Sequence, residues 1–290
     1  MIFDASKSEV CAGKMNYLKR GFLFYMCASC MLLVQFVIYL VNSNYWESLN
    51  FVGGFYYLMA ALGQAFLFNL IPWIVLYLPF VWWRQMRKVG TMLFTCAIFL
   101  LNVLAYLNGI VFQLYKFHIN GFVLDLAFGG GGKQVFVFNN TLVLHGVLIG
   151  LLILLFTLAV VFIAYRYARY VTSKQVKIGI YLFLFSCIAP QLTHAYAAAA
   201  NVNSISEVSA CLPQFYPLTA NRLMLKLGVV KKEDLYVNNP DKGKGHSFVY
   251  PLHPLEKVDS VKPLNIIYLI LDSWNFRTFT RGCCPNIRAF

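Results

Sequence analysis

Charged residues are scarce in this sequence, and acidic residues are scarcer than basic ones. Asp and Glu number 11 against 24 for Lys and Arg, and charged residues make up 12% of the chain against 60% for hydrophobic residues. An ordinary water-soluble domain is excluded, because it could not cover so much apolar surface. The net charge of +13 would suggest a nucleic-acid partner in a soluble protein. Most basic residues stand in short segments between apolar runs, so we expect no nucleic-acid partner.

Two signatures of secreted proteins are also missing. No small-residue cleavage pattern follows the first apolar run, so we expect this run to remain as a membrane anchor. The eight cysteines are scattered, and they predict no disulfide framework of the kind that stabilises small secreted domains. Four of them lie inside apolar runs, namely Cys27, Cys30, Cys96 and Cys187.

Five apolar runs are long enough to cross a bilayer. A hydrocarbon core about 30 Å thick requires roughly 20 apolar residues in a helix, and the chain has such runs at 22–41, 51–83, 92–114, 142–165 and 178–198. The second run is too long for one upright helix and too short for two spans with a turn. We interpret it as one tilted helix that can kink at Pro72. The predicted fold class is an α-helical membrane protein with a five-helix transmembrane bundle.

The distribution of basic residues predicts the orientation. The first loop has none and the third has only Lys116 and Lys133. The N-terminal segment and the second and fourth loops carry eleven, namely Lys7, Lys14, Lys19, Arg20, Arg84, Arg87, Lys88, Arg166, Arg169, Lys174 and Lys177. Because basic loops stay on the cytoplasmic side, we expect a cytoplasmic N-terminus and a C-terminus on the far side of the membrane.

Among the uncharged polar residues within the spans, the candidates for a function are Asn69, Asn102, Asn108, His145, Gln191 and His194. They could line a polar pathway, but a proton or ion relay usually requires charged residues, and no charged residue lies centrally in any span. We interpret them as hydrogen-bonding groups between helices. Transport is therefore disfavoured.

The third loop predicts a short interfacial helix within residues 117–128, followed by a glycine hinge at residues 129–132. A glycine run can also cradle phosphate groups in a nucleotide site. Here no strand precedes the run and no Gly-Lys-Ser/Thr ending follows it, so we reject that interpretation.

Residues 201–262 are polar, contain prolines and are typical of a linker. Within them, residues 219–228 predict a short helix with Thr219 as its N-cap and Gly228 at its C-terminal end. The free N–H groups of such a helix start, together with Arg222, would form an anion site that suits a phosphate. Only about twenty residues separate this segment from the fifth span, so an anionic lipid headgroup is the expected ligand. The alternative is an amphipathic linker helix with a solvated Arg222.

The run at 264–271 predicts a strand buried on both faces, and it ends at Asp272. A carboxylate at the carboxyl end of such a strand lies where α/β sheets bind ligands, and it can ligate a metal. One strand cannot form a sheet, so we expect a truncated α/β domain. The predicted organisation is a five-span domain at 1–200, a linker at 201–262 and the start of that domain at 263–290.

These patterns together resemble the YejM/PbgA family of inner-membrane proteins. Besides the five spans and the basic N-terminal segment, the resemblance rests on His118-Ile119-Asn120-Gly121-Phe122, Phe215-Tyr216-Pro217-Leu218-Thr219-Ala220, Tyr250-Pro251-Leu252 and Asn265-Ile266-Ile267 with Asp272. It covers essentially the whole chain. It implies a multi-pass protein of the Gram-negative inner membrane, with a periplasmic C-terminal domain of the sulfatase/alkaline-phosphatase fold.

The resemblance also implies a function in lipid sensing. In this family the linker binds the headgroup of lipid A, the anchor of lipopolysaccharide, at the periplasmic leaflet. The transmembrane part contacts an adaptor that controls proteolysis of the committed enzyme of lipid A synthesis, and cardiolipin is another suggested ligand. By position, the headgroup contacts would fall on Thr219, Ala220, Asn221 and Arg222. Asn221 stands where the family pattern has a first arginine, so we expect weaker binding.

The alternative function is a hydrolase or headgroup transferase of the sulfatase fold. By resemblance, Asp272 would ligate a divalent metal in the full-length periplasmic domain, although Ser273 replaces the second acidic residue common in catalytic relatives. Cys283 and Cys284 superficially match a sulfatase nucleophile motif, but the stretch 285–287 fits the turn after the first strand, and we reject the match. We expect no catalytic residue and no cofactor in this chain. A third candidate is a membrane anchor without a ligand.

Overall fold

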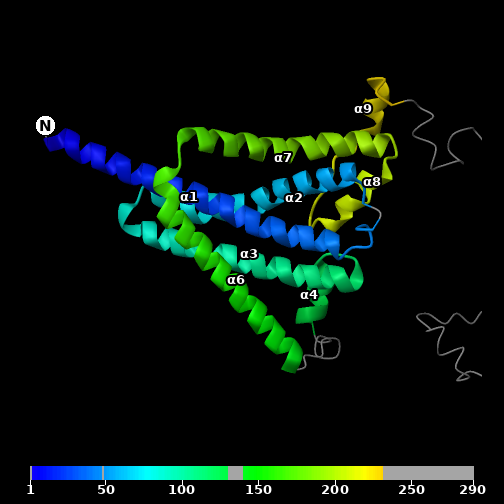
Figure 1. Ribbon diagram of the computed structural model, residues 1–290, viewed down its shortest axis with the longest axis horizontal. Coiled ribbons are helices and arrows are strands. Elements are labelled where there is room, and N and C mark those ends of the chain that lie inside the picture. Colours follow the sequence, from blue (N-terminus) through cyan, green and yellow to red (C-terminus); the bar gives the residue numbers. More distant parts are fainter. Residues whose placement is uncertain (1, 48, 130–139, 231–290) are drawn as a thin grey trace, which may run out of the picture. The chain divides into compact units, whose positions relative to one another are not determined.

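A computed structural model of the chain describes residues 2–47, 49–129 and 140–230 (Figure 1). All of them belong to the first of two compact units, residues 1–244, and the second unit is residues 245–290. The predicted strand at 264–271, Asp272, Cys283 and Cys284 lie outside the described residues.

Five long helices dominate the described part, which contains no strand. They are α1 (Ile2–Val41), α2 (Phe51–Pro72), α3 (Arg87–Tyr115), α6 (Asn140–Tyr167) and α7 (Ser173–Ala199) (Figure 1). Five segments are long and apolar enough to cross a membrane, namely Ala12–Val41, Phe51–Val81, Arg84–Tyr115, Val143–Tyr170 and Ser173–Ala199. The five-span prediction is confirmed, and the chain is a multi-pass membrane protein.

The first helix begins well before the predicted run at residue 22. It starts at Ile2, and its candidate span starts at Ala12. Lys and Arg are strong helix formers, so the basic stretch around Lys19 and Arg20 continues the helix although it lowers the hydropathy. Hydropathy alone therefore placed the start of this helix too late.

The second span changes its helix type at Pro72. The α-helix α2 ends there and is followed by a π-helix, η1 (Trp73–Tyr77), and a 3-10 helix, η2 (Leu78–Val81). Proline has no N–H for the helical hydrogen bond, and its ring clashes with the carbonyl one turn earlier, so a regular α-helix is disfavoured at this point. Tyr77 fixes the altered segment to α1, because its hydroxyl donates to the Tyr17 carbonyl at 2.8 Å and its ring stacks on Tyr17 at 4.2 Å. The single long span predicted here is confirmed.

Tyrosine hydroxyls also join α1 to α2. Tyr57 donates to the Phe36 carbonyl at 2.6 Å, and Tyr25 donates to the Phe66 carbonyl at 3.0 Å. All four residues are buried, Tyr57 and Phe36 in one apolar cluster and Tyr25 and Phe66 in another. A hydrogen bond between helices satisfies the polar tip of each tyrosine while its ring packs among apolar side chains.

Three of the polar residues singled out in the spans, Asn69, Asn102 and Asn108, bond to a neighbouring helix as predicted. The Asn69 amide donates to the Ser29 hydroxyl at 3.3 Å, which joins α2 to α1. Gln35 donates to the Asn102 side-chain carbonyl at 2.7 Å, which joins α1 to α3. His145 differs, because it is exposed on α6 and has no hydrogen-bond partner among the described residues.

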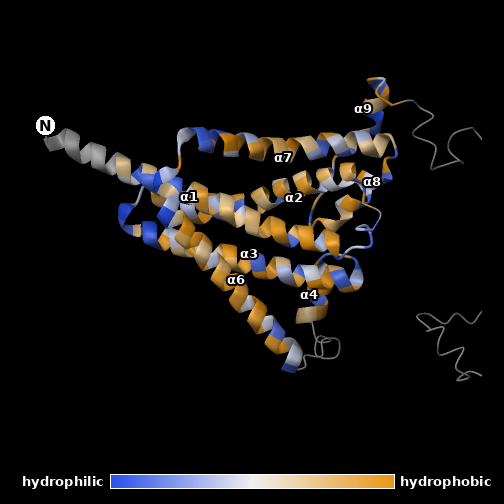
Figure 2. Cartoon of the chain, in the orientation of Figure 1, coloured by the Kyte–Doolittle hydropathy of each residue, from blue (hydrophilic) through white to orange (hydrophobic). Residues whose placement is uncertain are grey.

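The basic segments gather at one end of the helix bundle. The start of α1, the connection from η2 to α3 and the connection from α6 to α7 all lie there (Figures 1 and 2). Two cation–π contacts join these segments: the Arg20 guanidinium lies 4.5 Å from the Tyr165 ring, and that of Arg87 lies 5.6 Å from the Tyr17 ring. This end is called the basic end below.

The short helices lie at the opposite end of the bundle (Figure 1). They are α4 (Gly121–Phe128), α8 (Asn203–Ser206), the 3-10 helix η5 (Val208–Cys211) and α9 (Asn221–Lys226). The predicted third-loop helix is confirmed as α4, and the Asn120 side chain caps it by accepting from the Val123 N–H at 3.1 Å. Of the predicted glycine hinge, residues 130–132 lie outside the described residues.

Candidate lipid-headgroup site

The linker after η5 crosses α2 and is bound to it. The Gln64 amide, from the interior of α2, donates to the Pro213 carbonyl at 3.1 Å and lies 3.4 Å from the Gln214 carbonyl. Phe215 then packs against the buried cluster of α1 and α2. The first part of the linker is therefore fixed to the membrane-spanning bundle.

Helix α7 holds the next part of the linker through both backbone groups of Leu218. The Gln191 side-chain oxygen accepts from the Leu218 N–H at 2.7 Å. The Leu218 carbonyl lies 3.1 Å from Nδ1 of His194, and because a carbonyl only accepts, this nitrogen donates. Gln191 and His194 were predicted to join helices, and they bind the linker instead.

The predicted helix after Leu218 is present but shorter than expected. Helix α9 has six residues, Asn221–Lys226, and its N-cap is Ala220 with no side-chain hydrogen bond. The prediction that Thr219 caps it is wrong, because Thr219 precedes the cap by one residue and its hydroxyl makes no capping bond. The predicted C-terminal signal is confirmed: Gly228 has φ of +68°.

The end of α9 is a Schellman motif. The Gly228 N–H donates to the Leu225 carbonyl at 3.1 Å, and the Val229 N–H donates to the Met224 carbonyl at 3.1 Å. These two bonds satisfy carbonyls that the last helical turn leaves free. Backbone hydrogen bonds therefore fix the C-terminal end of this segment, although α9 itself is short.

Three of the four predicted headgroup residues are exposed. Thr219, Asn221 and Arg222 face outward, whereas Ala220 is half-buried. Arg222 has no hydrogen bond, ion pair or ring contact within the described part of the chain, so its guanidinium is available there to an anion. The four residues are consecutive in the chain and stand at the start of α9.

Sequence reasoning missed Lys226. It is exposed and lies four residues after Arg222 in the same helix, and residues at this spacing share a helix face. Arg222 and Lys226 therefore place two cations on one side of α9. The i, i+4 spacing was the signal that could have found Lys226.

Apolar side chains surround these cations. Leu218, Leu223 and Leu227 are 49%, 53% and 65% exposed. A short segment that exposes both basic and large apolar side chains is typical of a membrane interface, where the apolar groups enter the acyl region and the cations meet phosphates.

A hollow of about 420 Å³ lies beside the linker. His118, Ile119 and Asn120 line one side, and residues 215–217 line the other. Both stretches belong to the motifs on which the family resemblance rests. The structure therefore brings together two motifs that lie far apart in the sequence.

A hydrogen-bond network fixes His118 at the edge of this hollow. The Asn108 oxygen accepts from the Ile119 N–H at 2.8 Å, so its amide nitrogen faces Nδ1 of His118, 2.9 Å away. The Ala210 carbonyl lies 3.1 Å from the other ring nitrogen, Nε2, which therefore donates. This arrangement requires a neutral imidazole, and burial lowers the pKa of His118 accordingly.

The metal prediction stays untested, because Asp272 lies outside the described residues. Among the residues described, no group of three or more His, Cys, Asp or Glu side chains could hold a metal ion.

The comparisons with known proteins give one family. Residues 14–257 match the family described as "Domain of unknown function (DUF3413)". The match includes the first span from residue 14 on, the other four spans, the linker contacts and α9. No curated protein matches the chain.

Proposed function

The chain belongs to the DUF3413 family, and we propose that it is a lipid-binding regulator of the Gram-negative inner membrane. In this proposal it resembles the YejM/PbgA proteins in function: it senses lipid A or lipopolysaccharide at the periplasmic leaflet and controls outer-membrane lipid homeostasis. The N-terminus and the basic end face the cytoplasm, where an adaptor protein binds. The C-terminus is periplasmic.

One observation carries the proposal. Arg222 is exposed and unpaired among the described residues, and it stands four residues after Leu218, whose N–H and carbonyl are both bound to α7. A cation on a freely moving tether would bind a headgroup at a high entropic cost. The contacts at Leu218 restrict the position of Arg222 near the end of the span and so lower that cost.

The charge pattern supports a phosphorylated headgroup as the ligand. A guanidinium binds phosphate through two parallel hydrogen bonds, and a nearby ammonium adds a point charge. Arg222 and Lys226 provide this pair at the end of the bundle opposite the basic end. Cardiolipin and other anionic phospholipids also carry phosphates, and they are the competing ligands of the same site.

The test is copurification of lipid with the Arg222→Glu variant. Loss of a charge-assisted bond to phosphate is expected to lower the lipid A bound per protein by about tenfold or more. Arg169→Glu makes the same charge change at the basic end, where Arg169 is exposed and bonds to the Tyr170 hydroxyl at 2.7 Å, and it should leave lipid A unchanged.

Bound lipid is measured by mass spectrometry after purification in a neutral detergent. Thermal unfolding of both variants checks that the bundle is intact. Equal lipid A recovery from Arg222→Glu and the unmodified chain would rule the proposal out. A selective loss of cardiolipin with lipid A retained would also contradict it.

A further inference from the structure

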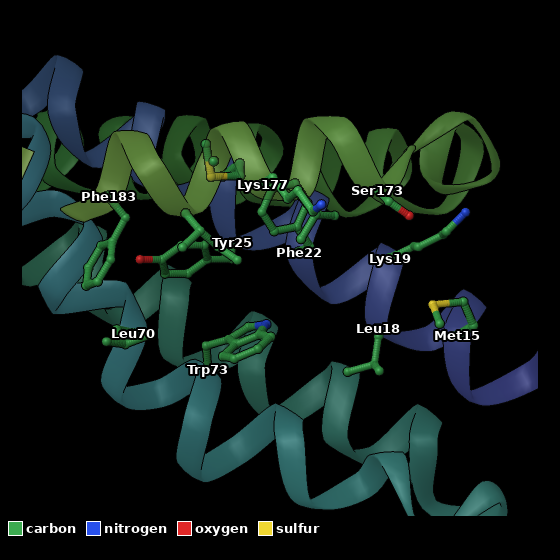
Figure 3. Close-up of a pocket in the computed structure, with 14 residues that line it drawn as sticks. Met15, Leu18, Lys19, Phe22, Tyr25, Leu70, Trp73, Ser173, Lys177 and Phe183 are labelled. Carbon is green, nitrogen blue, oxygen red and sulfur yellow. The ribbon is translucent and has the colours of Figure 1, made fainter. Parts of the chain in front are cut away.

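A separate cavity of about 580 Å³ lies between α1, α7 and the α2–η1 segment (Figure 3). Its volume is within the range of roughly 300–1,000 Å³ typical of ligand pockets. Apolar and aromatic side chains form most of its wall, among them Phe22, Met26, Leu70, Trp73 and Phe183.

Two lysines and a serine of the wall come from α1 and α7. Lys19 of α1 and Ser173 of α7 lie toward the same end in Figure 3, and Lys177 follows one turn further along α7. Among the described residues, no acidic side chain lines the cavity. Neither lysine has a hydrogen bond or an ion pair within the part of the chain that the structure describes.

This charged end is the basic end of the bundle, and the apolar wall extends into the span. Ser173 is the first residue of its candidate span, and Lys19 lies in the first third of the span Ala12–Val41. Helix rises about 1.5 Å per residue, so Met26 lies about 10 Å deeper than Lys19. The cavity therefore has the polarity of an amphiphile, with cations at the membrane surface and apolar walls below.

The packing of the helices explains why this space is open. Helices α1 and α7 each pack against α2. Between them the Phe22 side chain of α1 reaches α7 at Gly179, where an added Cβ would lie only 2.6 Å from Cζ of Phe22. Exposed wall residues such as Met15 and Ile180, 52% and 50% exposed, open the cavity toward the hydrocarbon. An apolar space of this kind gains dispersion contacts when an acyl chain fills it.

We propose that this cavity binds an anionic phospholipid of the leaflet at the basic end. One acyl chain lies against Phe22, Trp73 and Phe183, and the phosphate is held by Lys19 and Lys177. Charge complementarity selects this occupant, because two unpaired cations without an acidic neighbour favour an anionic headgroup over a zwitterionic one. The site shares no residue with the Arg222 region and does not depend on the function proposed there.

The test uses the full chain, purified in neutral detergent and titrated with dioleoyl phosphatidylglycerol or dioleoyl phosphatidylcholine. Native mass spectrometry counts the lipids that remain bound. We expect one phosphatidylglycerol to bind at a concentration that leaves phosphatidylcholine unbound. The double variant Lys19→Glu/Lys177→Glu should weaken this binding by about tenfold or more.

Matched variants separate the cavity from the general charge of the surface. Lys14→Glu/Lys174→Glu makes the same charge change on the same two helices outside the cavity wall, and it should retain phosphatidylglycerol. Val176→Trp fills the cavity from α7 and should abolish retention, whereas Leu184→Trp, an exposed α7 residue outside the wall, should not. Arg222→Glu should leave this lipid bound.

Several outcomes would overturn the proposal. Equal retention of the two lipids would show that the headgroup is not selected, and an equal loss in both lysine double variants would show only nonspecific attraction. If Val176→Trp retains the lipid, the acyl chain lies elsewhere. If it instead removes a dimer from the mass spectrum, the cavity holds a second copy of the chain. Should Val176→Trp fail to fold, the two lysine double variants still decide the question.

Discussion

Replacement of Gly63 by alanine should separate the two helices that hold the linker. Gly63 of α2 lies against the backbone of α7, and an added Cβ would stand 2.3 Å from the Ser186 carbonyl oxygen and 2.8 Å from its carbon. Backbone atoms cannot rotate away, so α2 and α7 must move apart by about 1 Å to reach an ordinary contact of 3.4 Å.

Overpacking of a tight interior costs about 1–3 kcal/mol. Alanine recovers up to about 1 kcal/mol of helix propensity relative to glycine. We therefore expect Gly63→Ala to lower the free energy of unfolding by up to about 2 kcal/mol. The added separation should also strain the linker contacts of Gln64 and Gln191, which come from the two displaced helices.

The assay is reversible unfolding of the purified chain in mixed detergent micelles, followed by circular dichroism. Gly150→Ala is the matched control, because nothing lies within 4 Å of a Cβ added to Gly150 of α6. This control should be neutral or slightly stabilising. The close approach of α2 and α7 would be refuted if the two alanine variants unfold at the same detergent composition.

Two further predictions concern the far end of the bundle. Gln191→Leu removes the acceptor of the Leu218 N–H, at a cost of about 1 kcal/mol. This variant should speed tryptic cleavage after Arg222. The control Thr193→Val alters only a bond within α7 and should leave the cleavage rate unchanged. Burial lowers the pKa of His118 in the folded chain below its ordinary value of 6.5. Between the folded and the unfolded pKa the unfolded chain binds more protons, so stability is lost as the pH falls through the folded pKa. His118→Gln should reduce the loss of melting temperature between pH 7.5 and 5.5, and an unchanged pH dependence would contradict the buried neutral imidazole.

The spans were predictable because a membrane imposes a length and a polarity on each helix. The discontinuity at Pro72 was predictable for another reason, because proline cannot donate the helical hydrogen bond. The sequence could not reveal that a π-helix and a 3-10 helix follow Pro72. The altered segment places Tyr77 against Tyr17, 60 residues away in the sequence, and no local pattern predicts that contact.

The candidate site was only partly predictable for a related reason. Gly228 was identified because its backbone conformation is a local property of the chain. The bond from Gln64 to Pro213 joins residues 149 apart, and no local pattern distinguishes Gln64 from any other polar residue in a span. Thr219 was misjudged because capping depends on the exact first residue of the helix, which a shift of one position changes.

The binding of the linker to two helices also sets an order of folding. Gln64 lies on α2 and Gln191 on α7. These two helices meet where the Cys187 thiol contacts the Gly63 carbonyl, although the two residues are 124 apart in the sequence. The surface that receives the linker does not exist until both helices have been inserted and have packed together. The linker is therefore held at both the Pro213 carbonyl and the Leu218 N–H only once the bundle is assembled.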